Sequence, residues 1–271
     1  RTVGGGWLVN SLGPSVNEML FQAIANRAGG IPASYDDVVY VQAPRATEGN
    51  RLAQLKLQRF NKGYLEEMFP DGGDGLLFKQ ELIYYPTATV DGRPESLKNA
   101  FNAVLDTEIR SFGPSRDSYR FNYIPQNHQD RDDFDRIMAL GQAFGASSAT
   151  LYARTAAVMD VDNWMRVFAL NVLTGLADTY NNGLAHNIQL YVRPGDRKVM
   201  LFPWDQDHAF YLAPTSSLYG GSSHRLAAII NLPANRRLYA GHLLDLCQTA
   251  FTNDFLDPVI THLHGSTVAN R

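Results

Sequence analysis

Cysteine is almost missing from this sequence, since Cys247 is the only one among 271 residues. One thiol cannot form an internal disulfide, and it cannot supply a cluster of thiolate metal ligands. The shortage fits a reducing compartment, but large secreted proteins also fold without disulfides. The cysteine content therefore excludes two kinds of cross-link and leaves the compartment open.

Long apolar runs and an excess of basic charge are missing as well. No apolar stretch approaches the ~20 residues that a membrane-spanning helix needs, so we expect no membrane span. The 24 Lys and Arg residues are scattered and are outnumbered by 27 Asp and Glu residues, which argues against a nucleic-acid partner. What remains, without repeats or low-complexity tracts, is the composition of an ordinary globular protein.

The chain begins Arg-Thr-Val, with neither an initiator Met nor a signal peptide. We therefore expect a piece of a longer polypeptide, whose other parts can hold further domains. The length is sufficient for a large core, arranged as one domain or as two lobes.

Hydrophobic periodicity predicts mixed structure in the first third of the chain. Apolar residues recur at helical spacing over residues 16–27, and Gly29-Gly30 ends the pattern. A short helix is expected over residues 64–69, before Pro70. Alternating or β-rich runs predict strands at residues 37–42, 51–57 and 76–79.

The rest of the chain is mainly helical. Residues 87–131 are polar, with one helix expected over residues 96–108. The most regular pattern covers residues 160–176, where Asp160 or Asp162 can cap the first turn. Strands first, helices later and an inserted hairpin make an α+β protein. The other expected elements are helices at 132–144 and 236–264, and strands at 187–192 and 198–202 joined by a turn at 194–196.

Four polar residues lie close together in residues 171–210, a segment otherwise built to be buried: Asp178, Asn187, Asp205 and Asp207. Burying an isolated carboxylate is costly, because the ion loses its hydration. Asp178 follows the long helix, and Asn187 opens the hairpin. A spacing of two on an extended segment sends Asp205 and Asp207 to one face, so we expect all four residues around one cleft.

The oxygen ligands in this segment suit Mg²⁺ or Mn²⁺, which bind few protein carboxylates and keep positions for substrate phosphates. In a phosphotransferase, one carboxylate accepts the proton of the acceptor hydroxyl, while an Asn and a second carboxylate hold metal ions. The order Asp178, Asn187, Asp205 matches that set. The nine positions from Asp178 to Asn187 exceed the spacing in ordinary protein kinases.

A plainer interpretation is open for each of these residues. Asp-x-Asp pairs are common in turns, and Asp178-Thr179 can simply cap a loop. Trp204, at the end of a strand, is hard to explain by packing alone. The combination of Trp204 with the acidic residues therefore favours a functional site.

Four motifs follow one another in this part of the chain. They are Asp-Val-Asp at 160–162, Gly-x-x-Asp at 175–178, Asn-x-x-Leu-Tyr at 187–191 and Pro-Trp-Asp-x-Asp-x-x-Phe at 203–210. In this order the motifs resemble those of the spore coat protein H (CotH) kinase family. Weaker similarity covers nearly the whole chain.

The resemblance implies an atypical protein-kinase-like fold, with a single domain over residues 1–271. Residues 1–85 would be the remainder of an N-terminal lobe, and residues 86–271 a mostly helical C-terminal lobe with its catalytic segment at 171–210. The family is a transferase family that uses ATP with a divalent cation to phosphorylate Ser or Thr hydroxyls of proteins. The resemblance also implies an extracellular or cell-surface location.

The resemblance assigns a role to each candidate residue by position. Asp178 matches the acidic residue of the catalytic loop, and Asn187 matches the loop Asn that binds metal and nucleotide. Asp205 matches the metal-binding Asp, and Asp207 is either a second metal ligand or an anchor for the loop. Lys79 can reach the phosphates of ATP, although a Lys that ends an apolar strand usually extends to water.

The chain departs from the family pattern at several positions. Ala177, Asn17 and Gln58 stand where the family usually has Asn, Arg and Glu. The family's Arg-Gly-Asn hairpin and Lys-rich strand, expected before Trp7, are not in this sequence, and the glycines at 4–6 fit a linker better than a phosphate loop. These departures favour an alternative, a non-catalytic surface or matrix protein built on a CotH-like fold.

A metal hydrolase that uses His186 and His208 beside Asp205 is a third alternative. Histidine is a common metal ligand, but these two lack the i, i+4 spacing of a helical pair. His262 and His264, near the end of the chain, are expected at the surface.

Overall fold

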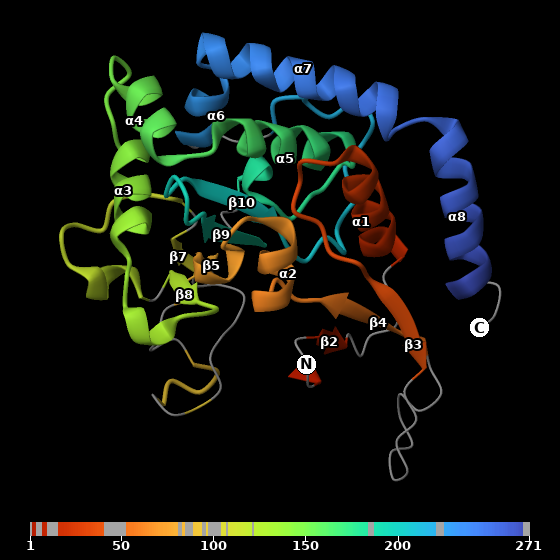
Figure 1. The fold of residues 1–271 in the computed structure, drawn as a ribbon, viewed down its shortest axis with the longest axis horizontal. Coiled ribbons are helices and arrows are strands. Elements are labelled where there is room, and N and C mark those ends of the chain that lie inside the picture. Colours follow the sequence, from red (N-terminus) through yellow and green to blue (C-terminus); the bar gives the residue numbers. More distant parts are fainter. Residues whose placement is uncertain are drawn as a thin grey trace.

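The computed structural model shown in Figure 1 describes most of the chain. A central four-stranded sheet carries helices on both faces, and a second sheet lies beside the first helix, at the lower right of the view. The described residues are 2–3, 7–9, 16–40, 53–80, 83–84, 89–93, 96, 104–106, 108–120, 122–183, 187–220 and 225–267.

The central sheet is antiparallel throughout, in the order β10-β9-β5-β8. Its expected hairpin is confirmed, with Val192 opposite Val199 and a turn at residues 194–196. Strand β5, from the first third of the chain, pairs with β9 and with β8. The strands are β5 (Leu76–Gln80), β8 (Tyr123–Pro125), β9 (Ile188–Val192) and β10 (Val199–Pro203).

Both faces of the central sheet are covered, because every residue of β9 and β10 is buried, and Gln189 is the one polar side chain among them. Successive side chains point to opposite faces. One set, including Phe78 and Leu190, joins the large core beneath the C-terminal helices. The other set, including Tyr191 and Phe202, joins a smaller aromatic cluster with residues of α2 (Lys62–Met68).

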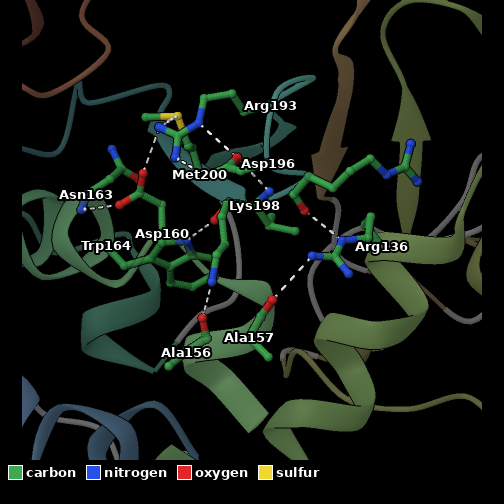
Figure 2. Close-up of polar contacts among 12 residues, drawn as sticks. Arg136, Ala156, Ala157, Asp160, Asn163, Trp164, Arg193, Asp196, Lys198 and Met200 are labelled. Atoms are coloured by element: carbon green, nitrogen blue, oxygen red, sulfur yellow. Dashed lines mark hydrogen bonds and ion pairs between the residues drawn. The ribbon is translucent and has the colours of Figure 1, made fainter. Parts of the chain in front are cut away.

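Helix α5 (Val161–Leu173) is fixed to the central sheet at its first turn, as Figure 2 shows. The Asp160 carboxylate accepts a hydrogen bond from the Asn163 amide at 3.2 Å, so Asp160 rather than Asp162 is the cap. The Trp164 indole donates to the Val199 carbonyl of β10 at 2.8 Å. The Leu201 amide donates to the Asn163 side chain at 2.7 Å. The long helix predicted from periodicity is therefore confirmed.

The first part of the chain forms a second sheet, in the order β1-β2-β4-β3. The strands predicted from residues 37–42 and 51–57 are present as β3 and β4, and the helix predicted from residues 16–27 is present as α1. The elements are β1 (Thr2–Val3), β2 (Trp7–Val9), α1 (Val16–Ala28), β3 (Asp37–Tyr40) and β4 (Ala53–Gln58).

The helix expected over residues 96–108 is wrong where the structure describes it. Residues Val104–Asp106 form strand β7, which pairs with β6 (Ile83–Tyr84). Cross-strand pairing over a short apolar run outweighed a weak helical spacing. Residues 97–103 and 107 of this prediction lie outside the described residues.

Five helices of the later chain surround the core, and Figure 1 shows α7 running above α5 and α8 beside α1. No helix among the described residues is long and apolar enough to cross a membrane. His262 and His264 are exposed, as expected. The helices are α3 (Asp135–Phe144), α4 (Leu151–Val158), α6 (Arg225–Ile230), α7 (Pro233–Thr249) and α8 (Asn253–Thr267). The short α4 was not predicted.

Candidate functional site

Asp178 and Asn187 lie in direct contact, although nine positions separate them in the chain. The Asn187 side-chain amide donates to Asp178 Oδ2 at 3.0 Å and to the Asp178 carbonyl at 3.3 Å. Asn187 is buried and holds a left-handed backbone with φ of 56°, a conformation that Asn adopts more readily than most residues. Because Nδ2 donates to Asp178, the amide oxygen is the side-chain atom of Asn187 that would contact a cation.

Backbone hydrogen bonds bring the loop of Asp205 and Asp207 to the same place. The Trp204 amide donates to the Asn187 carbonyl at 3.1 Å, which extends the hairpin by one step beyond β10. The Ala177 amide donates to the His208 carbonyl at 3.2 Å. The segment before Asp178 and the segment after Asp207 are therefore held side by side, while the expectation of one cleft lined by all four candidate side chains stays a prediction.

The expected extended path through Asp205 and Asp207 is wrong. Strand β10 ends at Pro203, Asp205 has a left-handed φ of 59°, and Asp207 begins a turn. Gln206 points inward with 0% exposure, while Asp205 is exposed and Asp207 is partly exposed. The two carboxylates are thus placed by a loop around a buried glutamine, not by strand alternation.

The donor set fits a cation that substrate phosphates complete, rather than a preformed metal centre. In the part of the chain that the structure describes, no three side chains of His, Cys, Asp or Glu are grouped so that they could hold a metal ion. Mg²⁺ commonly uses one or two carboxylates and takes its other oxygen ligands from phosphates and water. Asn187, Asp205 and Asp207 as metal ligands stay predictions.

Helix α1 supports this loop with residues that the sequence analysis did not assign to the site. Asn17 donates to the Ala209 carbonyl at 2.9 Å, and Glu18 accepts from the Gln206 amide at 3.3 Å. Glu18 is only 2% exposed. Burial first, and then the charges of neighbouring carboxylates, raise the pKa of Glu18 to about 9; those carboxylates are Asp36, Asp205 and Asp207.

A signal for these supporting residues was present in the helical pattern of residues 16–27. Glu18, Phe21 and Gln22 occupy one face at i, i+3, i+4 spacing, and all three are buried. Polar residues on an apolar face need partners. Their presence predicts an internal polar contact, but the sequence does not say with which segment.

Lys79 lies on β5 directly opposite Gln189 of β9, and it is neither fully buried nor exposed. Its neighbour Gln80 pairs with Ile188, so Lys79 is close to the start of β9, next to Asn187. Paired residues share a face, which puts Lys79 on the side of the aromatic cluster around Tyr191. Its role toward phosphates stays a prediction.

Trp204 has an ordinary packing role, which corrects the expectation that packing alone could not explain it. The indole is partly buried against the smaller aromatic cluster. Its ring centroid is 5.8 Å from that of Phe60, in an edge-to-face arrangement. Phe60 in turn meets Phe202 at 5.0 Å. Trp204 therefore anchors the end of β10 and gives no separate evidence for chemistry.

The Asp160-Val161-Asp162 motif is also explained by structure. The Asp160 carboxylate lies 2.9 Å from Arg193 in an ion pair, and both side chains are shown in Figure 2. Asp162 lies 2.9 Å from His242 of α7. The motif holds α5 against the residue after β9 and against α7, and these contacts account for both of its acids.

The hydrolase alternative gains little from the geometry. His186 lies outside the described residues. His208 is exposed, stacks on Tyr211 with ring centroids 4.9 Å apart, and approaches Asp207 only to 3.9 Å.

A cavity of about 650 Å³ opens beside the loop of Asp178. Its walls come from the end of α5, the turn at Gly175, the short 3-10 helix Tyr180–Asn182 and the loop at residues 210–220. Among the described residues that line the cavity, none carries a charged side chain. A cavity without a cation does not suit the phosphates of a nucleotide.

Comparison with known proteins shows which family the chain resembles. A family model described as CotH kinase protein matches residues 55–268. No curated protein matches the chain. Among solved structures, a chain of the Shewanella oneidensis MR-1 toxin–antitoxin complex of HipA, HipB and operator DNA is similar, with 14% identity and a TM-score of 0.42. The match covers 96% of this chain and 53% of that one, so this chain spans about half the length of its solved relative.

Proposed function

Because the chain belongs to the CotH kinase protein family, as the match over residues 55–268 shows, we propose that it transfers the γ-phosphoryl group of ATP to Ser or Thr hydroxyls of a protein substrate. The observation that carries this proposal is the contact between Asn187 and Asp178 beside the loop of Asp205. Phosphoryl transfer requires a base, an amide and a carboxylate, and we assign these roles to Asp178, Asn187 and Asp205.

In the proposed reaction, the acceptor oxygen forms a bond to the γ-phosphorus while the bond from that phosphorus to the β–γ bridging oxygen breaks, and ADP leaves. Asp178 accepts the hydroxyl proton, and the Asn187 amide holds the direction of its carboxylate. Bound Mg²⁺ or Mn²⁺ would supply charge neutralisation of the phosphates. We assign its protein ligands to Asn187, Asp205 and Asp207.

Lys79 is the residue to which we assign contact with the phosphates of ATP. It is the Lys that β5 places beside the start of β9, next to Asn187. A single Lys acts as a point charge toward phosphate. We propose a location outside the cell or at its surface by family analogy alone.

The proposal is tested by following labelled γ-phosphate from ATP into a general acceptor protein, with Mn²⁺ or Mg²⁺ present. We expect Asp205→Ala to lower transfer by about 100-fold or more, since it removes a charge that acts on the transferring group. Asp196→Ala is the matched control, because Asp196 lies in the exposed turn of the same hairpin and pairs with Arg193. Equal activity of Asp205→Ala and wild type would reject the assigned role.

A second candidate function is a non-catalytic surface or matrix protein, favoured by Gln58. The Gln58 side chain accepts a hydrogen bond from the Tyr35 amide at 2.9 Å, so it has a structural partner where the family's Glu would carry a charge. Loss of that charge weakens the expected anchoring of a phosphate-binding Lys. This candidate predicts that nucleotide and metal do not change the melting temperature of the protein.

A further inference from the structure

Gln206, the middle residue between Asp205 and Asp207, is fully buried and reaches across the molecule to α1. Its Oε1 accepts a hydrogen bond from Gln22 Nε2 at 3.1 Å, between residues 184 positions apart. Gln22 itself is 3% exposed. Among the described residues, this is the one hydrogen bond of the Gln206 side chain. The Nε2 atom of Gln206 has no hydrogen-bond partner there.

The other end of the Gln22 amide is also engaged. Its Oε1 accepts from the Ser34 backbone amide at 3.0 Å, which fixes the orientation of the carboxamide and leaves Nε2 to donate to Gln206. The contact therefore depends on a residue with both a donor and an acceptor at this position. An apolar side chain of the same length would lose both bonds.

From Ser34 the polar contacts continue into the second sheet. The Ser34 hydroxyl donates to Asp36 Oδ1 at 2.7 Å, and the Gln58 backbone amide approaches the same oxygen at 3.4 Å. Gln58 ends β4. A continuous series of hydrogen bonds thus runs from the Asp205–Asp207 loop, through α1, to the sheet of the first part of the chain.

We infer that Gln22 is a positioning residue for the loop of Asp205 and Asp207. It holds Gln206 inward, and this determines the backbone turn that directs the two carboxylates outward. The inference rests on the proposed function only where it concerns metal and nucleotide; the effect on the loop follows from the buried contact itself. Removing one partner of a buried hydrogen bond leaves the other unsatisfied, so the loop should loosen.

Hydrogen exchange of the whole chain tests the effect on the loop without any ligand. In Gln22→Met we expect amides of residues 206–212 to exchange about tenfold faster, the loss of roughly one buried hydrogen bond, while those of α5 keep their rates. Asn235→Ala is the control: Asn235 is equally buried but bonds the Ile229 carbonyl on the C-terminal side. Unchanged exchange in residues 206–212 of Gln22→Met, or equal acceleration in both variants, would overturn the inference.

A binding measurement separates positioning from general damage. We expect Gln22→Met to weaken Mn²⁺ binding in the presence of ATP by about tenfold, and to leave the dissociation constant of ATP in EDTA unchanged. Gln206→Met should also weaken Mn²⁺ binding, and the double variant should be no worse than Gln22→Met, because Gln22→Met already removes the contact between the two side chains. Equal losses with and without metal, or additive losses, would contradict positioning.

The two proposals fail in different ways. If wild type binds neither Mn²⁺ nor ATP, the proposed kinase function fails, and the exchange rates still decide whether Gln22 positions the loop. If wild type binds both and Gln22→Met matches it in exchange and in affinity, only the positioning inference fails.

Discussion

Glu18 is a buried carboxyl group next to the loop of Asp205, and it lies near Asp36 and Asp207 as well. An ionised carboxylate loses hydration there and meets charges of its own sign. The acid is therefore favoured in its neutral form, in which it can still accept the Gln206 amide. Burial is also the main cause that raises the pKa of the Asp36 carboxyl, to about 6.

The burial of Glu18 predicts that the free energy of unfolding depends on pH. The folded-state pKa of Glu18 is about 9 against an ordinary 4.5, so between these values the unfolded chain releases a proton that the folded protein retains. The free energy of unfolding therefore falls as pH rises through this window. We expect Glu18→Gln to be more stable than wild type at pH 8, by more than about 1 kcal/mol, and the difference to vanish near pH 4.5.

Urea unfolding in EDTA at pH 5, 6.5 and 8 measures this difference. Glu67→Gln is the control, because Glu67 is an exposed glutamate of α2. A stability difference between Glu18→Gln and wild type that is the same at all three pH values would show that ionisation of Glu18 is not the cause.

At the scale of elements, α5 sets the position of the candidate segment, because the chain turns after Leu173 and then reaches Asp178. Its first turn is attached to the sheet through Asp160, and Asp160 also pairs with Arg193. Movement at the first turn would be carried along a rigid helix to the loop that follows it. The Asp160 cap therefore stabilises α5 and also affects the position of the loop that contains Asp178.

The two acids of the Asp160-Val161-Asp162 motif should differ in their contribution to stability. Asp160→Ala loses both the cap and the partly buried ion pair, and we expect it to lower the free energy of unfolding by about 1–3 kcal/mol. Asp162 pairs with His242 but its side chain is 67% exposed, so Asp162→Ala should cost under about 1 kcal/mol. Equal losses in denaturant titrations would contradict the assignment of the cap.

The sequence was sufficient to predict helices and strands whose apolar pattern is long. It was insufficient for strands that form only because a distant segment pairs with them. Helices α1 and α5 follow from apolar periodicity, and the β9–β10 hairpin follows from two apolar runs around a turn. Strand β7 was predicted as helix, because its partner β6 lies 20 residues earlier and the pattern of one segment does not contain it.

The candidate site was predictable to the same extent. Asp178, Asn187 and Asp205 were chosen as candidates because their types and order are those of phosphoryl transfer, and their roles stay predictions. Glu18 and Gln22 were missed as site residues, because their contact with Gln206 joins segments more than 180 positions apart. Local propensity carries no information on such a contact; only the folded arrangement brings the two segments together.

For the molecule as a whole, α1 is bonded at both of its ends to the later part of the chain. Its first turn bonds the Asp205–Asp207 loop through Asn17. Its last turn is held by Arg166 of α5, which donates to the Ala28 and Gly29 carbonyls and pairs with Asp245 of α7 at 2.8 Å. The division of the chain into lobes at residue 85 stays a prediction, but α1 is the element through which ligand binding near Asp205 would reach the second sheet.

Ligand binding should therefore raise the stability of the whole chain. A measurement of stability with and without ligand separates the two candidate functions. A ligand that binds only the folded state stabilises it by RT ln(1 + [L]/Kd), about 2.7 kcal/mol at 100 times Kd. For a chain of this length we expect Mn²⁺ with ATP to raise the melting temperature by about 5 °C or more.

The rise should require both components and should be lost in Asp205→Ala, because that carboxylate is assigned to the metal. Asp196→Ala, in the turn of the same hairpin, should keep the full rise. A melting temperature of wild type that is insensitive to ATP, to Mn²⁺ and to both together would favour the non-catalytic surface protein. A rise in wild type that persists in Asp205→Ala would leave nucleotide binding in place and move the metal site to other residues.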